Sequence, residues 1–269
     1  MKLNVMTFNI CHGADYPELL KKYPVPLCFG YDKNDDLCAR SDFEEILREW
    51  RDSVTLDPVA NLINRLDCDI IALNEVRGQG EAYYYTNQAE YLANCTNRHF
   101  YFAKSVTFPG EGAYGTALLS RFPIKKAQTI PIPPISEHPG REPRCLLKAV
   151  VEAEQEVTVF ISHFGGLPLE QQMAVEVLRK EMEQVTTPVL FLGDLNAIPE
   201  SKELQGVYER MVEAFAKENP ATFPSFEPSR KIDYIFASKP ARFSKAEVIK
   251  EIVSDHYPLV AEVLFDTAE

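Results

Sequence analysis

The sequence predicts an α/β fold in which two mixed β-sheets pack face to face and helices cover their outer sides. Three observations favour this fold class. Short apolar runs typical of buried strands occur along the whole 269-residue chain. Amphipathic helices separate some of these runs, whereas others follow one another directly, so strand–helix–strand units and hairpins are interleaved. No long linker divides the chain, and we expect a single domain over residues 1–269.

The predicted elements begin with a strand at residues 3–10, "LNVMTFNI". A helix follows at 57–66, with Asp57 as its N-cap and Pro58 at its first helical position. A second helix at 167–185 has apolar residues at helical spacing, namely Leu169, Met173 and Val177. The remaining predicted strands are 69–76, 115–124, 144–153, 157–164, 187–193, 231–237 and 256–265.

Two segments are predicted to lie outside this pattern. Residues 12–52 are far longer than an ordinary connection, and we expect an insertion with its own short helix at 42–50. Residues 131–144, "PIPPISEHPGREPR", form a proline-rich loop that cannot be a central strand. Long loops on a rigid scaffold often carry substrate contacts.

Composition restricts the classes of function. No apolar stretch approaches the roughly 20 residues of a membrane helix, and the N-terminus lacks a signal-peptide pattern, so we expect a cytoplasmic protein. The net charge of −12 disfavours a polyanion such as duplex DNA as the substrate. The basic residues within 229–250 are not dense enough to reverse this expectation.

The six cysteines show no CxxC pair and no zinc-like spacing. Isolated reduced thiols are therefore the preferred interpretation. Cys28 and Cys38 lie in the same irregular segment and would be able to pair in an exported protein. The sequence leaves that pairing open.

Several apolar strands carry a polar residue at or near one end, and this pattern is the strongest functional signal. One such residue is usually a cap or a turn former. A set drawn from the whole chain instead predicts a shared site at one edge of a sheet. Carboxylates and amides suit a hard divalent cation, and histidines suit proton transfer or charge stabilisation. The set comprises Asn9, Glu75, His163, Asp194, Asn196, Asp233, Asp255 and His256.

The ordered motifs resemble the endonuclease/exonuclease/phosphatase superfamily, which contains deoxyribonuclease-I-like nucleases, AP endonucleases, sphingomyelinases, inositol phosphate phosphatases and deadenylases. The resemblance rests on "TFNI", "NEV", "YGTALLSR", "SHF", "GDLN", "KIDYIF" and "SDHYPL", and it runs from residue 3 to residue 265. It implies a four-layer α/β sandwich. It also implies hydrolysis of a phosphoester with Mg²⁺, for which Mn²⁺ is a possible substitute.

The resemblance also implies roles for individual residues. Glu75 corresponds to the direct metal ligand, and Asn9 and Asp255 would support the metal directly or through water. Asp194 would orient or deprotonate the attacking water. Asn196 would hold that water or a phosphate oxygen.

The remaining roles concern charge and phosphate binding. His256, oriented by Asp233, would stabilise the phosphorane or transfer a proton. His163 would contact phosphate or assist the leaving group, and Tyr114 corresponds to a phosphate-contacting tyrosine. From its own chemistry, Arg144 is predicted either to clamp phosphate with its planar fork or to form a surface salt bridge.

The chain departs from the family pattern at two positions that we expect to be neutral. Asn74 stands where glutamine is usual, and the histidine strand reads "SHF" where many members have "THL". The insertion after Asn9 is expected to roof the pocket and favour small substrates. His12 is a weaker candidate for the pocket lining, whereas His99 and His138 are expected to be structural or exposed.

Three functions are compatible with these residues. The favoured one is a Mg²⁺-dependent phosphoesterase or phosphodiesterase acting on a small or lipid-derived phosphate ester. A nuclease is the alternative, which a basic, aromatic-lined groove beside the metal site would support. A non-catalytic metal- or phosphate-binding module ranks last, because none of the expected metal or histidine positions is lost. No protein partner can be inferred from the sequence.

Overall fold

The computed structural model describes residues 1–23, 43–136, 138, 140–216 and 218–266. Its first sheet consists of β1 (Lys2–Asn9), β2 (Ile70–Gly80), β3 (His99–Phe108), β4 (Gly112–Ser120), β11 (Arg242–Val248) and β12 (Leu259–Leu264). The six strands are ordered β11-β12-β1-β2-β4-β3, and only β1 and β2 run parallel. The parallel pair therefore lies at the centre of the sheet.

The second sheet has the same number of strands and a similar plan. It consists of β5 (Ile124–Pro131), β6 (Cys145–Glu152), β7 (Glu156–Ser162), β8 (Val189–Asp194), β9 (Met211–Glu213) and β10 (Asp233–Ser238). Its order is β5-β6-β7-β8-β10-β9, with a central parallel pair formed by β7 and β8. Both sheets are mixed, as predicted.

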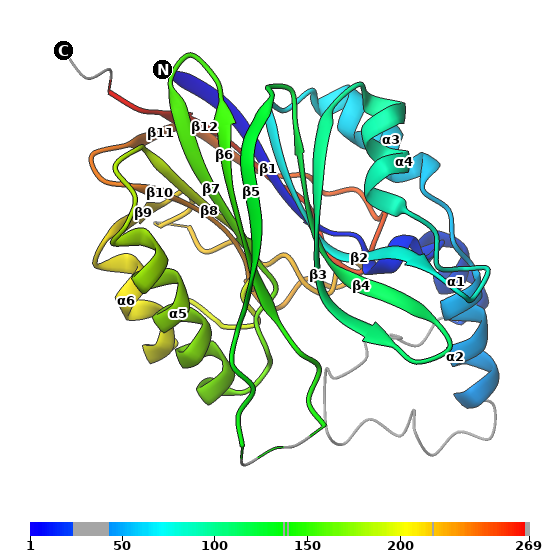
Figure 1. Ribbon diagram of the computed structural model, residues 1–269. Coiled ribbons are helices and arrows are strands. Elements are labelled where there is room, and N and C mark those ends of the chain that lie inside the picture. The colour runs from blue at the N-terminus through cyan, green and yellow to red at the C-terminus, as the bar shows by residue number, and fades with distance from the viewer. Residues whose placement is uncertain (24–42, 137, 139, 217, 267–269) are drawn as a thin grey trace.

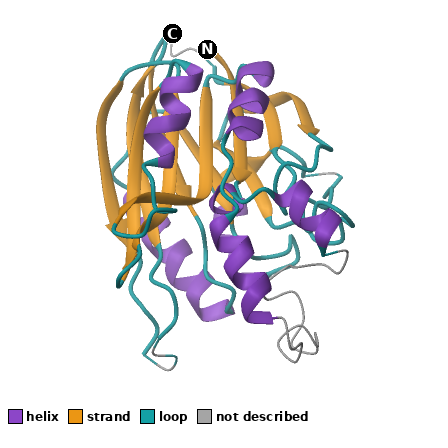
Figure 2. Cartoon of the chain, turned by 90° about the vertical axis from the view of Figure 1, so that its right-hand side faces the viewer, coloured by secondary structure: helices purple, strands orange, loops and turns teal. Residues whose placement is uncertain are grey.

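Helices cover the outer sides of the two sheets, which confirms the four-layer α/β sandwich (Figures 1 and 2). Helices α3 (Asp57–Leu66) and α4 (Gln88–Thr96) pack on the first sheet. Helices α5 (Pro168–Met182) and α6 (Gln205–Tyr208) pack on the second. None of the helices in the described part of the chain is long and apolar enough to cross a membrane.

Three apolar layers hold this arrangement together. The layer between the sheets is built from strand residues that include Val5, Ile70, Leu118, Val159, Leu190 and Ile235. A second layer joins Phe8 and Leu73 to Leu62 of α3 and Leu92 of α4. A third joins Phe160, Phe191 and Phe236 to Leu178 of α5. Alternate residues of each central strand therefore face different layers, and the strands are buried on both sides.

The segment after β1 folds into a 3₁₀ turn at Cys11–Gly13 and two helices, α1 (Tyr16–Lys22) and α2 (Phe43–Asp52). The short helix predicted at 42–50 is α2, whereas α1 was not predicted. Both helices lie beyond the strand ends in Figure 1, at the end of the molecule opposite the two termini. Their apolar faces form a separate cluster comprising Cys11, Ala14, Tyr16, Leu19, Ile46 and Trp50. Cys28 and Cys38, whose pairing was left open, lie outside the described residues.

Three details of the predicted elements were wrong: the N-cap of α3, the extent of the strand at 115–124 and the buried face of α5. The N-cap of α3 is Leu56, and Asp57 is instead the first helical residue, where its carboxylate accepts a hydrogen bond from Tyr91. The predicted strand at 115–124 is two strands, because the chain crosses from the first sheet to the second between Ser120 and Ile124. Pro123 in this crossing cannot supply a ladder N–H.

Helix α5 also buries a different face from the predicted one. Leu169 is 39% exposed, and Met173 and Val177 lie at the margin of the apolar layer. The buried residues are Gln171, Ala174, Val175 and Leu178. Gln171 is buried because its amide donates to the backbone oxygens of Gly165 and Asn196, which connects α5 to the loop that follows β8.

Gly193 allows β7 and β8 to approach closely at the end of the second sheet. Its φ is +147°, and a Cβ at this position would lie 1.9 Å from the backbone oxygen of Ser162. Only glycine fits here without displacing a neighbouring strand. The glycine of "GDLN" therefore has a packing role.

We predict that Gly193→Ala lowers the free energy of unfolding by roughly 3 kcal/mol or more, because the new methyl group meets backbone rather than a movable side chain. Urea unfolding followed by circular dichroism measures the change. Gly166→Ala is the matched control, since Gly166 is exposed and its Cβ would meet nothing closer than 3.7 Å. Equal stability of the two variants would contradict this account of Gly193.

Candidate functional site

The predicted polar residues come together where the central strands of both sheets end. We predicted a site at one edge of a single sheet, and this was wrong: Asn9 and Glu75 belong to the first sheet, whereas Asp194 and Asp233 belong to the second. The two sheets face each other, so the corresponding ends of β1 and β8 lie side by side. The site lies on the seam between the sheets.

The side chain of Asn9 lies at the centre of this site and is completely buried. Its Nδ2 lies 3.0 Å from Oε1 of Glu75, 3.1 Å from Oδ2 of Asp194 and 3.4 Å from Nε2 of His256. Its Oδ1 accepts a hydrogen bond from the backbone N–H of Cys11. One amide therefore links residues from both sheets and from the segment before β12.

Glu75 does not end its strand, as the sequence suggested, but occupies an irregularity within it. Strand β2 continues to Gly80, and its pairing with β4 shifts register between Leu73 and Val76. Glu75 has φ +56°, a costly conformation for a glutamate, which turns its side chain toward the site. The hydroxyl of Tyr114 donates to its Oε2 at 2.8 Å.

Glu75 is ionised in this environment. Burial opposes ionisation, but the hydrogen bonds that Asn9 and Tyr114 donate to the carboxylate stabilise its charged form and hold the pKa of Glu75 below its usual value. The contact of Tyr114 with Glu75 positions the carboxylate. The expected contact of Tyr114 with phosphate remains a prediction.

Asp233 and His256 form a buried pair. Nδ1 of His256 lies 2.8 Å from Oδ2 of Asp233, and this oxygen also accepts a hydrogen bond from Thr222. Burial alone would lower the pKa of His256, but the carboxylates of Asp233, Asp194 and Asp255 raise it to about 10. His256 is therefore a cation at neutral pH.

The antiparallel pairing of β8 with β10 places Asp194 directly opposite Asp233. Its Oδ2 lies 3.6 Å from Nε2 of His256. Its Oδ1 accepts a hydrogen bond from the backbone N–H of Asn196, which has φ +48°. Burial, together with the charge of Asp233, outweighs the effect of His256 and raises the pKa of Asp194 to about 7.

His163, Asn196 and Arg144 form one side of the site. Nε2 of His163 lies 3.0 Å from Nδ2 of Asn196 and 3.5 Å from Oδ2 of Asp194. Nη1 of Arg144 lies 3.0 Å from Nδ1 of His163 and 2.7 Å from Oε1 of Glu142. Burial and the charge of Arg144 hold the pKa of His163 well below its usual value, so this ring is neutral.

Of the two roles considered for Arg144, the salt bridge is present, but it is not on the surface. The side chain of Arg144 is only 17% exposed and lies beside the site. His99 and His138 are exposed, as expected. Among the described cysteines, Cys11, Cys68, Cys95 and Cys145, none forms a disulfide.

The donor set of the site fits a hard divalent cation. Glu75, Asp194, Asp233 and Asp255 are acidic groups gathered around one histidine cation, His256. Asp255 accepts a hydrogen bond from Ser254, and burial together with the charge of Glu75 raises its pKa to about 6. Raised carboxyl pKa values mark a local shortage of positive charge. A cation held by carboxylate and amide oxygens would relieve it.

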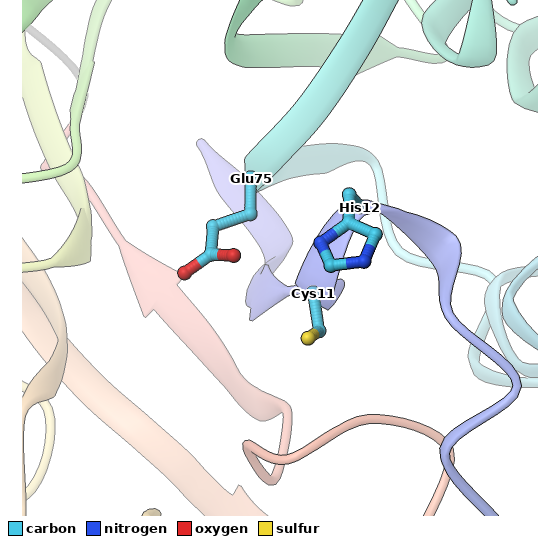
Figure 3. Close-up of side chains that lie close together, drawn as sticks. All are labelled: Cys11, His12 and Glu75. Atoms are coloured by element: carbon cyan, nitrogen blue, oxygen red, sulfur yellow. The ribbon is translucent and has the colours of Figure 1, made fainter. Parts of the chain in front are cut away.

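Glu75 also belongs to a further group of side chains that could bind a metal ion. Ligand atoms of Cys11, His12 and Glu75 all lie within 4.8 Å of one another (Figure 3). From the sequence we expected His12 to be a weak candidate for the pocket lining, and we did not consider Cys11 as a ligand. Burial and the charge of Arg77 lower the pKa of His12 to about 4, so its ring is neutral.

Asn74 has a role that the sequence reasoning missed. Its Oδ1 accepts a hydrogen bond from the backbone N–H of Asp194, and its Nδ2 donates to Oγ1 of Thr116. It is completely buried and connects β2 and β4 of the first sheet to β8 of the second. The one signal of this role in the sequence was the departure from glutamine at position 74, which we expected to be neutral.

A sequence profile of the Endonuclease/Exonuclease/phosphatase family matches residues 6–256. The uncharacterised protein YbhP of Escherichia coli is 26% identical over 239 residues, which cover 81% of this chain and 88% of YbhP.

Solved structures share the fold. An endonuclease/exonuclease/phosphatase from Beutenbergia cavernae superposes with a TM-score of 0.70 at 20% identity, covering 97% of this chain and 71% of that one. A mannosyl-6-phosphatase from Bacteroides thetaiotaomicron gives 0.71 at 14% identity, covering 98% and 100%. These two similarities establish the fold alone.

We predict that Asn74→Ala lowers the free energy of unfolding by about 1–3 kcal/mol, because the buried N–H of Asp194 loses its acceptor. Urea unfolding measures the loss, and hydrogen exchange at the end of β8 should become faster. Asn64→Ala is the control, since Asn64 is exposed and its amide makes one surface hydrogen bond to Cys95. A loss no larger than in this control would exclude the bridging role.

Proposed function

The chain belongs to the Endonuclease/Exonuclease/phosphatase family, whose members hydrolyse phosphoester bonds, and we propose that it is a Mg²⁺-dependent hydrolase of a small or lipid-derived phosphate ester. The observation that carries the proposal is the arrangement around Asp194. A buried carboxylate lies 3.6 Å from the cationic His256, and Asn9 bridges it to Glu75. Such groups match the charges of phosphoester hydrolysis by in-line attack of water.

His256 supplies positive charge opposite the reacting phosphorus. Its Nδ1 proton is held by Asp233, so Nε2 faces the site. A fixed cation in a buried position stabilises the extra negative charge of a pentacovalent phosphorane. The proton on Nε2 of this ring is available to an oxygen of the phosphoryl group. His256 would thus combine its two expected roles, charge stabilisation and proton transfer.

Asp194 and Asn196 act on the attacking water. The pKa of Asp194, raised to about 7, suits a group that orients water and accepts its proton near neutral pH. The side-chain amide of Asn196, adjacent to His163, would hold the water or a phosphate oxygen. His163 is neutral, so it serves as a hydrogen-bond partner for phosphate or for the leaving group.

Glu75 would hold the metal ion directly, and Asn9 and Asp255 would hold it directly or through water. When bound, Mg²⁺ polarises the phosphoryl group and lowers the pKa of a coordinated water. Asn9 donates a hydrogen bond to one oxygen of the Glu75 carboxylate and Tyr114 donates one to the other. This carboxylate is thus preorganised.

The charges around the site favour a small substrate over duplex DNA. Two arginines near the site are engaged with acidic side chains: Arg144 pairs with Glu142, and Arg141 makes two hydrogen bonds to Glu170. Together with the net charge of −12, these pairs leave little positive charge for a polyanion. Mannosyl-6-phosphatase, named for a structural neighbour, is an example of a family member with a small sugar phosphate.

We predict Mg²⁺-dependent hydrolysis of chromogenic phosphate esters by the wild-type protein, with Mn²⁺ as a substitute. A matched phosphodiester and phosphomonoester distinguish phosphodiesterase from phosphatase activity, and single-stranded and duplex DNA test the nuclease alternative. Glu75→Gln should abolish the metal-dependent rate. Asp194→Ala should lower it by about 10²–10⁴-fold, because the group that handles the water is lost.

The control for these variants is Asp57→Asn, at an exposed carboxylate on α3. All variants are checked for native circular dichroism before their rates are compared. Unchanged turnover in EDTA would contradict the metal-dependent mechanism. Equal rates for Asp194→Ala and wild type would show that the catalytic residues are misassigned.

The pH dependence tests the role of His256. Its raised pKa keeps it protonated at neutral pH, so kcat/KM should fall only as the pH rises toward about 10. Removing the charge of Asp233 lowers the pKa of His256, and Asp233→Asn should therefore move this alkaline limb toward neutral pH. Rate profiles from about pH 6 to 9.5 measure the shift. An unmoved limb with merely reduced rates would contradict the charge role.

A further inference from the structure

We propose that Cys11, His12 and Glu75 form a second metal site, which binds a transition-metal ion such as Zn²⁺. The site lies beside the oxygen ligands assigned to Mg²⁺ and shares Glu75 with them. Binding of the ion does not depend on the proposed phosphoesterase function. Only one consequence, inhibition of hydrolysis, rests on that function.

The three side chains converge from two parts of the chain. Cys11 and His12 lie in the 3₁₀ turn after β1, and Glu75 lies in the irregular part of β2. Their ligand atoms lie within 4.8 Å of one another. Figure 3 shows one ring nitrogen of His12 turned toward the carboxylate of Glu75, with the thiol of Cys11 below the ring.

All three residues have left-handed backbone conformations. The φ values are +45° for Cys11, +47° for His12 and +56° for Glu75. Elsewhere in the described chain, positive φ at residues other than glycine is confined to aspartate and asparagine, which together with histidine tolerate it best, so the conformation is most costly at Cys11 and Glu75. Costly conformations of this kind persist where the surroundings impose them, and they concentrate at functional sites.

The surroundings of the turn hold it in place. The backbone N–H of Cys11 donates to Oδ1 of Asn9, and the backbone oxygen of His12 accepts a hydrogen bond from Nε2 of Gln88 at 2.7 Å. Gly13 packs tightly, since a Cβ there would lie 2.7 Å from Leu56. Hydrogen bonds to β1 and α4 therefore preorganise the backbone of the turn.

The ring of His12 is oriented as in a ligand. Its Nε2 lies 3.4 Å from the backbone oxygen of Trp50 in α2. A carbonyl oxygen can only accept, so Nε2 carries the proton and Nδ1 keeps its lone pair. A metal-binding histidine typically donates its other N–H to a carbonyl or a carboxylate in this way. The insertion thus supplies the partner that fixes the tautomer.

The chemistry of these donors selects the ion. A thiolate, an imidazole and a carboxylate are the three ligand types of Zn²⁺, and a fourth position would remain for water. Mg²⁺ prefers oxygen ligands and does not compete for a thiolate. Ligand atoms around a tetrahedral Zn²⁺ lie about 3.3–3.7 Å apart. Side-chain rotations that move the ligand atoms by about 1 Å would therefore close the site.

Because the two sites share Glu75, an ion bound by Cys11 and His12 competes with Mg²⁺ for this carboxylate. Zn²⁺ should therefore inhibit Mg²⁺-dependent hydrolysis, and Cys11→Ser should relieve the inhibition. Neither Cys11 nor His12 belongs to the residues assigned to hydrolysis.

The test uses Co²⁺ as a spectroscopic probe on the full-length reduced protein. We expect one equivalent of Co²⁺ to produce a thiolate-to-metal charge-transfer absorption. Added Zn²⁺ should displace the Co²⁺ and abolish this absorption, whereas added Mg²⁺ should not. The only tryptophan of the chain, Trp50, has its ring 6.4 Å from that of His12, so its fluorescence should change in the same titration.

Variants locate the ion. Cys11→Ser should abolish the charge-transfer absorption, and His12→Gln should weaken Co²⁺ binding by at least about 10-fold, the smallest loss typical even of an outer-shell partner. Two controls should bind as wild type: Cys95→Ser, at an exposed cysteine of α4, and the double variant Cys28→Ser/Cys38→Ser, which removes the thiols of the insertion.

Two results would overturn the proposal: no charge-transfer absorption in the wild-type protein, or an absorption that survives Cys11→Ser and disappears in the Cys28/Cys38 double variant. If Cys11→Ser does not fold, the wild-type spectrum and the His12→Gln affinity decide. Because metal binding is read without a substrate, the two proposals are tested separately. Absence of Mg²⁺-dependent hydrolysis in protein kept free of Co²⁺ and Zn²⁺, together with normal Co²⁺ binding in a parallel sample, would contradict the proposed function alone. Hydrolysis without Co²⁺ binding would contradict the second site alone.

Discussion

The side-chain amide of Asn9 donates to two carboxylates and lies beside an imidazole, and these three groups come from three separate segments of the chain. These are Glu75, Asp194 and His256, at 3.0, 3.1 and 3.4 Å. Asp194 is buried and Glu75 is half-buried, and burial of a charge is costly unless it is paired or hydrogen-bonded. Because one amide stabilises both carboxylates, the ends of the two sheets must meet within hydrogen-bond distance. The sandwich is therefore arranged around a charged seam, and the cost of that seam is offset by the apolar layers on either side.

Much of the fold and of the site was predictable because both depend on strongly patterned central strands. The apolar runs that end in Asn9 and Asp194 are buried on both faces, which leaves a clear signal in the sequence. The resemblance to a known family then joined these strand ends into one constellation. The edge strands β3, β5 and β11 were missed because their residues alternate in exposure and carry charges.

The missed features of the site arise from contacts that no local pattern encodes. Glu75 is turned by a register shift against β4, which depends on a strand about forty residues away. Asn74 gains its role only when β8 of the other sheet is beside it. The same is true of α5, where Gln171 is buried because two backbone carbonyls need its amide. Propensity and periodicity describe one element at a time, whereas these residues satisfy polar groups of another element.

The turn after β1 shows how an insertion can alter a site without contributing a catalytic group. The oxygen of Trp50 lies against His12, and the ring of Trp50 packs on Tyr16 in the apolar cluster of α1 and α2. That cluster fixes the position of α2, and α2 fixes the protonated nitrogen of His12. Since His12 and Glu75 are neighbours, packing within the insertion determines which donors face the metal ligand. The identity of the bound ion would then be set partly by residues that touch neither the ion nor the substrate.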